Sequence, residues 1–347
     1  MTQPPWAFQS ALQQNLYWFL HPQSKNLDAG GAHVVLQVAK LLAEGYGQLT
    51  FPPQKLNIIS KRVPDFVESV YFSEDRAFRR PIVELARFGR DRMSPYLRHF
   101  FLHGSLASLD YCRGWSDVDT FLVVARETAT DPQRLSMLRS LLHEAYAYLT
   151  AVDPLQHHGF IVMTELDLLC FPPSALPPVA LDAALSLLPG AGEIVFQTRE
   201  CAATIRSAAE GRLALFQSAL NSGEFRHHDR DGVYLQARWR NASNAMYQLK
   251  YFLSMIMIQP AYLLEAMGCP CLKRDSFSRC QRILASEWEI IERASAVRRE
   301  WPERECHPFR GNAIPAWVRD TIGDDYFERG QALVAAVAAQ LRSSDSR

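Results

Sequence analysis

The spacing of apolar residues changes along the chain and divides it into three parts. From Trp6 to about residue 93, apolar positions recur at the three- and four-residue intervals of amphipathic helices, with prolines as interruptions. The segment from Tyr96 to Leu102 is mainly apolar, and a second apolar run extends from Val118 to Val124, so both are predicted as buried strands. Helical spacing returns after residue 194 and continues to about Leu341.

A helix and a third strand are predicted after the second apolar run. Residues 131–149 place their apolar side chains on one helical face, and the run from His157 to Met163 predicts a strand. A proline-rich stretch then leaves the sheet. We therefore predict an α+β fold in which an N-terminal helical extension (1–80) and a C-terminal helical domain (186–347) flank a sheet domain (81–185).

The turn after the first strand and the start of the second carry the candidate chemistry. Asp117 and Asp119 stand two residues apart at the start of a strand, so their side chains are expected on one face while Val118 enters the core. Two neighbouring carboxylates suit Mg²⁺, which prefers oxygen ligands together with phosphates and water. Gly104 permits a close backbone approach, and Gly104-Ser105 is expected to form a phosphate-binding turn. The alternative is a surface hairpin with a solvated acidic pair.

This order of residues resembles the polymerase-β-like nucleotidyltransferase superfamily, which includes DNA polymerase β, kanamycin-type nucleotidyltransferases, poly(A) polymerases and cyclic-dinucleotide synthases. Its signature is an apolar strand, Gly-Ser or Gly-Gly, a gap of roughly ten residues, and Asp-apolar-Asp before further apolar residues. Gly104-Ser105 and Asp117-Val118-Asp119 match in this order, within a similarity that covers residues 94 to about 171. The resemblance implies a small mixed-sheet nucleotidyltransferase domain, a metal site at Asp117 and Asp119 for Mg²⁺ or Mn²⁺, and a nucleoside triphosphate donor, most simply ATP.

The third metal carboxylate of this family is missing from its usual place on the third strand. His158 stands roughly at that position, so it is the candidate third catalytic residue, as a metal ligand or as the base that deprotonates the acceptor. Glu165 and Asp167, at the far end of the strand, are the other candidates. His157 and His158 could equally be ordinary strand-end residues.

Basic residues of the C-terminal region are the candidate phosphate ligands. In the resembled family, the helical domain sends Lys or Arg side chains over the cleft. Lys250, on a helix predicted from Val233 to about Met267, is the first nucleotide-binding candidate, and Lys273 with Arg274 in the following loop is the second. Tyr247 or Tyr251 could stack on the base or belong to the core.

Composition and charge restrict the partners. The chain has 37 basic and 37 acidic residues, and this balance disfavours binding to long nucleic acid. The seven cysteines show no zinc-site spacing, and the adjacent polar residues from His227 to Gly232 predict a solvated turn rather than a metal cluster. No signal peptide or membrane helix is visible, so we expect a cytoplasmic protein.

Two functions are compatible with this sequence. The first is a metal-dependent nucleotidyltransferase that transfers a nucleoside monophosphate from a nucleoside triphosphate to a hydroxyl of a protein or small-molecule acceptor, with release of pyrophosphate. The second is a catalytically degenerate nucleotide-binding module that acts through a partner protein. The missing third carboxylate favours the second function, and the intact Gly-Ser and Asp-x-Asp elements favour the first.

Overall fold

The fold of the chain was analysed in a computed structural model. It describes residues 31–47, 57–69, 76–156, 159–169, 176–190, 192–198, 202–228, 234–238, 245–305 and 313–344, with residues 16, 20 and 171. His157 and His158 lie outside the described residues.

A four-stranded mixed sheet forms the centre of the sheet region. Its strands are β2 (Leu97–His103), β3 (Asp119–Val124), β4 (Phe160–Thr164) and β5 (Leu185–Ser186), in the order β4-β3-β2-β5. Strand β2 is antiparallel to β3 and β5, whereas β3 and β4 are parallel. The parallel pair is connected by α7 (Pro132–Val152), which begins where the Asp131 carboxylate accepts hydrogen bonds from two backbone amides. The mixed sheet predicted from the sequence is confirmed.

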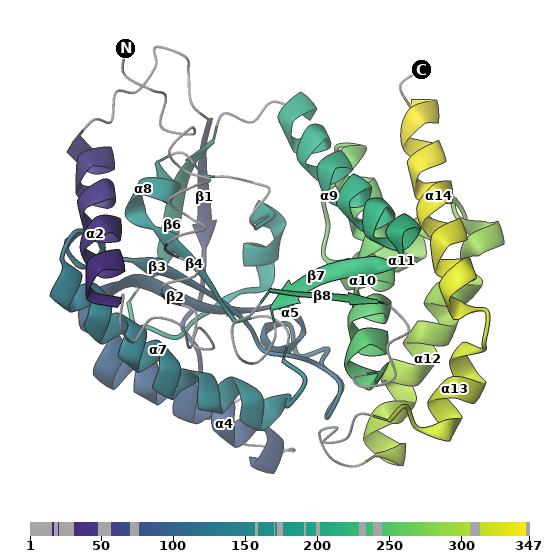
Figure 1. Cartoon of the computed structure of the whole chain (residues 1–347), viewed down its shortest axis with the longest axis horizontal. Helices are drawn as coiled ribbons and strands as arrows, with labels where there is room; N and C mark the ends of the chain where they lie inside the picture. Colours follow the sequence, from purple (N-terminus) through teal and green to yellow (C-terminus); the bar gives the residue numbers. More distant parts are fainter. Residues whose placement is uncertain are drawn as a thin grey trace.

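Helices cover one face of this sheet. The helices on this face are α2 (Gly31–Gly47), α4 (Arg76–Phe88) and α7, which share a core with the sheet (Figure 1). A π-helical turn (Gly89–Met93) and a 3-10 turn (Ser94–Tyr96) lead from α4 into β2. The core of this layer takes alternate residues of the sheet, namely Phe100, Leu102, Val118, Leu122 and Val124. The predicted burial of Val118 is thus confirmed.

A second layer covers the opposite face. Strands β1 (Asn57–Arg62) and β6 (Glu193–Thr198) form an antiparallel pair, and the core beneath it contains Phe101, Phe121, Ile194 and Phe196. This pairing corrects the prediction, because β1 lies in the segment predicted as a helical extension and β6 lies in the region predicted as helical. β1 is largely exposed, and its sequence Asn-Ile-Ile-Ser-Lys-Arg does not alternate apolar and polar residues, so the sequence carried no strand signal.

The C-terminal region is mainly helical. It consists of α9 (Ala202–Ser222), α10 (Ala245–Ala266), α11 (Lys273–Cys280), α12 (Glu289–Arg304), α13 (Ala316–Ile322) and α14 (Tyr326–Ser344), which share one core (Figure 1). Trp115, from the loop before β3, enters this core and contacts Trp301 edge-on, with ring centroids 5.1 Å apart. The sheet region and the helical region are therefore packed together beside the start of β3.

Two predictions for this region need correction. A hairpin of β7 (Glu224–His228) and β8 (Tyr234–Arg238) precedes α10, so the long helix predicted from Val233 begins only at Ala245. His227 and His228, predicted within a turn, are the last residues of β7. The remaining short elements are α5 (Gly104–Ala107), α6 (Arg126–Ala129), α8 (Glu165–Leu168) and 3-10 turns at Pro178–Ala183 and Ala285–Glu287.

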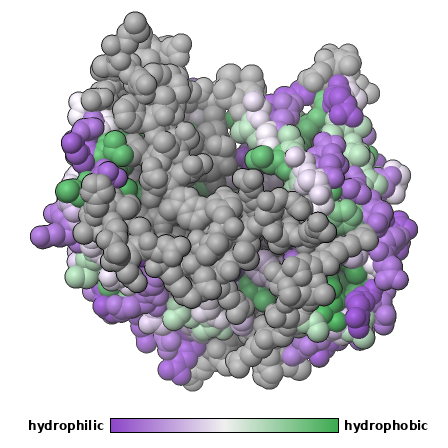
Figure 2. Space-filling view, in the orientation of Figure 1, coloured by the Kyte–Doolittle hydropathy of each residue, from purple (hydrophilic) through white to green (hydrophobic). Residues whose placement is uncertain are grey.

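Hydrophilic side chains predominate over the C-terminal helices on the right of Figure 2, with apolar residues scattered among them. Within the part of the chain that the structure describes, none of the helices combines the length and the apolar character that crossing a membrane requires.

A buried histidine gives the sheet region a pH dependence. His99 on β2 is 7% exposed and stacks on Phe101, and burial lowers its pKa from 6.5 to about 4. The unfolded chain takes up this proton near pH 6.5, whereas the folded chain resists protonation until about pH 4, so stability falls with pH through this window. We expect a loss of roughly 2–3 kcal/mol between pH 7 and 4.5 from this residue. Urea unfolding should show a smaller loss for His99→Phe; an unchanged loss would contradict the assignment.

Candidate functional site

The turn between β2 and α5 brings Gly104 against Asp119. Gly104 has a φ of +69°, a conformation that side chains other than glycine rarely adopt. A Cβ atom at this position would lie 2.1 Å from Oδ2 of Asp119. Strand pairing causes this approach, since His103 and Asp119 are partners in the β2–β3 ladder. The glycine is therefore required by both its backbone conformation and its neighbour.

Asp117 and Asp119 line one cavity of about 350 Å³, together with Gly104 and Ser105. Val118, between the two carboxylates, is fully buried in the core on the opposite face of the sheet. The sequence prediction that the two carboxylates share a side is confirmed by this arrangement. The cavity lies between the sheet region and α10, and its size is that of a small-molecule site.

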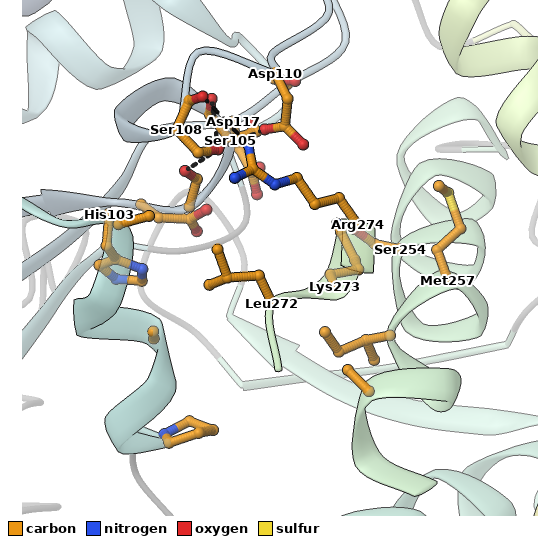
Figure 3. A pocket seen from close by; sticks show the side chains of 18 of the residues that line it. His103, Ser105, Ser108, Asp110, Asp117, Ser254, Met257, Leu272, Lys273 and Arg274 are labelled. Atoms are coloured by element: carbon orange, nitrogen blue, oxygen red, sulfur yellow. Dashed lines mark hydrogen bonds between the residues drawn. The ribbon is translucent and has the colours of Figure 1, made fainter. Parts of the chain in front are cut away.

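Three basic residues from the C-terminal region line the same end of the cavity. They are Lys273 and Arg274 at the start of α11 and Arg298 on α12. Figure 3 shows Arg274 extending toward Ser105 and Ser108, and its Nη1 donates to the Ser108 carbonyl at 3.4 Å. Arg298 Nη2 donates to the carbonyl of Asp110 at 2.6 Å. The polar lining of the cavity thus combines carboxylates and cations.

Lys273 lines the cavity together with Asp117 and Asp119, and their charges act on its ammonium group. Burial lowers the pKa of Lys273 and the Arg298 guanidinium adds to this, while Asp117, Asp119 and Asp110 act in the opposite direction. Lys273 was predicted from the sequence as a nucleotide-binding candidate, but Arg298 and Asp110 were not. No local motif marks these two, because their place in the cavity depends on how α12 packs against the loop after α5.

Lys250 also lines the cavity, but its ammonium group is already paired with a carboxylate. Its ammonium forms an ion pair with Asp153, at the end of α7, and the two residues are 5% and 1% exposed. Burial raises the pKa of the Asp153 carboxyl, which Lys250 opposes and Asp117 increases. Lys273, rather than Lys250, is therefore the lysine that this geometry favours for binding a ligand.

Two of the candidates for a third carboxylate are excluded. Glu165 and Asp167 follow Thr164, which pairs with Val124, whereas Asp119 stands five positions earlier on β3. At about 3.3 Å per residue, they lie roughly 17 Å from the carboxylate pair. Glu165 accepts a hydrogen bond from the Arg126 amide, and Asp167 caps α8. The prediction that they could complete the site is wrong, because β4 runs parallel to β3 and carries them away.

The described part of β4 presents an apolar residue to the cavity. Ile161, which pairs with Phe121, lines the cavity, while His158 lies outside the described residues and stays a prediction. Among the residues that the structure describes, no group of three or more His, Cys, Asp or Glu side chains is arranged to hold a metal ion.

The other end of the cavity is mainly apolar. The apolar lining residues on α10 are Met255, Met257, Ile258, Ala261 and Tyr262, beside the polar Ser254 and Glu265, and the segment before β5 contributes Leu176, Pro177, Val179 and Ala180. Tyr247 and Tyr251, which were predicted either to stack on a base or to join the core, pack against the helical core. The apolar end therefore comes from α10 and the segment before β5.

Comparison of the chain with known protein families, curated proteins and solved structures found no match.

Proposed function

We propose that this protein is a metal-dependent nucleotidyltransferase, which transfers a nucleoside monophosphate from a nucleoside triphosphate to a hydroxyl group and releases pyrophosphate. One observation carries the proposal. The Gly104-Ser105 turn touches Asp119, so the two separate parts of the sequence motif meet at one end of a single cavity. Lys273, Arg274 and Arg298 line the same end. Two carboxylates beside clustered cations suit a metal–triphosphate complex.

The residues present fit a divalent cation that is shared with the nucleotide. Asp117 and Asp119 supply only oxygen ligands, which suit Mg²⁺, and Mg²⁺ commonly takes its other ligands from phosphates and water. Bound there, the ion would supply charge stabilisation at the reacting phosphate. The contact between Gly104 and Asp119 leaves no space for a side chain at the turn.

The chain's own residues would bind and orient the donor. Ser105 would donate its hydroxyl to the terminal phosphates, and Lys273 and Arg298 would offset the charge that develops on leaving pyrophosphate. The apolar walls would exclude water from the nucleoside end, which strengthens these electrostatic interactions. ATP is the expected donor.

The acceptor is proposed to be a hydroxyl of a protein or a small molecule. Two further carboxylates at or near the cavity are neutralised internally, because Glu265 pairs with Arg212 and Asp153 with Lys250. An acceptor with several positive charges would need unpaired carboxylates in the wall. The arrangement therefore supports an acceptor of low charge.

The test measures transfer of ³²P from α-labelled nucleoside triphosphates in cell extract with Mg²⁺ or Mn²⁺. Wild type should label a protein or a small molecule, and Asp117→Ala/Asp119→Ala should reduce labelling at least about 100-fold, since the metal contributes several kcal/mol. Asp320→Ala removes an exposed carboxylate on α13 and serves as the control. Metal-dependent nucleotide binding without transfer would instead support the degenerate binding module. The residue that described strand β4 contributes to the cavity, Ile161, is apolar, which agrees with that alternative.

A further inference from the structure

The turn that follows α7 is held in one conformation by its own hydrogen bonds. The backbone amide of Gln156 donates to the carbonyl of Asp153 at 3.0 Å, and the amide of Leu155 donates to the Asp153 carboxylate at 3.0 Å. All three residues are at most 6% exposed. The Gln156 side chain therefore extends from a fixed backbone.

The Gln156 side chain holds the backbone of Val118 at two points. Its Oε1 accepts from the Val118 amide at 3.0 Å, and its Nε2 donates to the Val118 carbonyl at 3.0 Å. These two groups belong to the peptide units that join Val118 to Asp117 and to Asp119. Fixing both units restricts the directions in which the two carboxylates leave the backbone.

The position of Val118 explains why a side chain is needed there. The described β2–β3 ladder ends at the His103–Asp119 pair, and the described β3–β4 ladder begins at the Thr120–Phe160 pair. Val118 precedes both, so its amide and carbonyl lie beyond the last ladder partners while its side chain is fully buried. Gln156 supplies the hydrogen bonds that a neighbouring strand would otherwise provide, and buried backbone groups require such partners.

The same turn is anchored to the helical region. Asp153, whose carboxylate accepts from Leu155, also forms the buried ion pair with Lys250 on α10. A connected path therefore runs from α10 through Lys250, Asp153 and Gln156 to Val118. This path connects α10, which forms part of the cavity wall, to the backbone that carries the carboxylate pair.

We infer that Gln156 is a positioning residue for the Asp117–Asp119 pair, which it orients through the Val118 backbone without itself touching a ligand. This role rests on the proposed function of the carboxylate pair, since positioning matters only where the pair binds a metal–nucleotide complex. Groups that orient metal ligands from behind typically change metal affinity 10- to 100-fold when they are removed.

The test uses Gln156→Met, which keeps side-chain volume and removes both hydrogen bonds. Gln156→Asn is the second variant, because it keeps a polar amide that is one methylene too short to reach Val118. Gln259→Met is the matched control, since Gln259 is buried like Gln156 and donates through Nε2 to a backbone carbonyl, that of Met255. Mn²⁺ affinity is measured on the full chain by electron paramagnetic resonance of free Mn²⁺, and hydrogen–deuterium exchange is followed in peptides covering residues 115–124.

The expected result is a 10-fold or greater loss of Mn²⁺ affinity in both Gln156 variants, with faster exchange at residues 115–124, and neither change in Gln259→Met. Wild-type affinity in a folded Gln156 variant would overturn the inference. If wild type itself binds no Mn²⁺, the proposed function fails, and the exchange data decide the positioning role separately. Unchanged exchange in the Gln156 variants would then refute it, and faster exchange confined to this segment would support it.

Discussion

Replacing Gly104 with alanine is expected to weaken metal-dependent nucleotide binding about 100-fold and to destabilise the fold by roughly 2–4 kcal/mol. The new Cβ would lie 2.1 Å from Asp119 Oδ2 and 3.0 Å from its Cγ, so the carboxylate must move. The alanine must also adopt a φ of +69°, which costs an L-residue roughly 1–2 kcal/mol. Binding of a fluorescent ATP analogue with Mn²⁺, together with urea unfolding, measures both effects.

Gly190→Ala separates the two causes. Gly190 has a nearly identical φ of +75°, but a Cβ there would meet nothing within 4 Å. This control should lose only about 1–2 kcal/mol of stability and keep full nucleotide affinity. If Gly104→Ala binds the metal–nucleotide complex as well as Gly190→Ala does, the contact between the turn and Asp119 has no role in binding.

Lys250→Met is expected to destabilise the folded chain by about 3–5 kcal/mol. The substitution keeps an unbranched side chain but leaves the Asp153 carboxylate buried, at 1% exposure, without its cationic partner. Burial raises the pKa of the Asp153 carboxyl, and the nearby Asp117 adds to this. Because the site is buried, water does not replace the lost ion pair. Urea unfolding at pH 7 measures the change.

Two further variants define the cause of that loss. Lys250→Met/Asp153→Asn removes both charges and keeps an oxygen for the Leu155 amide, so most of the stability should return. Arg80→Met breaks an exposed ion pair with Glu84 on α4 and should change stability by no more than about 1 kcal/mol. A double variant as unstable as Lys250→Met would show that packing, rather than the unpaired charge, causes the loss.

Part of the candidate site is local in sequence and could be predicted from it. The alternation around Val118 places the flanking carboxylates on one side, because strand geometry fixes the directions of residues two apart. The glycine at the turn was predicted because glycine permits a close backbone approach, and the structure adds that Gly104 has a positive φ. The apolar runs likewise predict three strands and an intervening helix, whereas the mixed sheet that they form was implied only by the family resemblance and is seen in the structure.

The tertiary structure decided everything that depends on contacts between distant segments. Strand β1 pairs with β6, which lies more than a hundred residues later in the chain. No local periodicity in the sequence indicates this pairing or its register. The direction of β4 removed Glu165 and Asp167 from the site. Helix packing directed Lys250 to Asp153 and brought Lys273 and Arg298 to the cavity.

The sequence by itself thus determined the carboxylate pair, the glycine turn and the strands that carry them, because each depends on backbone geometry over a few residues. Only the tertiary structure decided which cations face the pair and what holds it in place. A buried lysine or glutamine side chain must form an ion pair or hydrogen bonds, and its orientation follows from the partner it finds. For Lys250 and Gln156 that partner comes from another part of the chain.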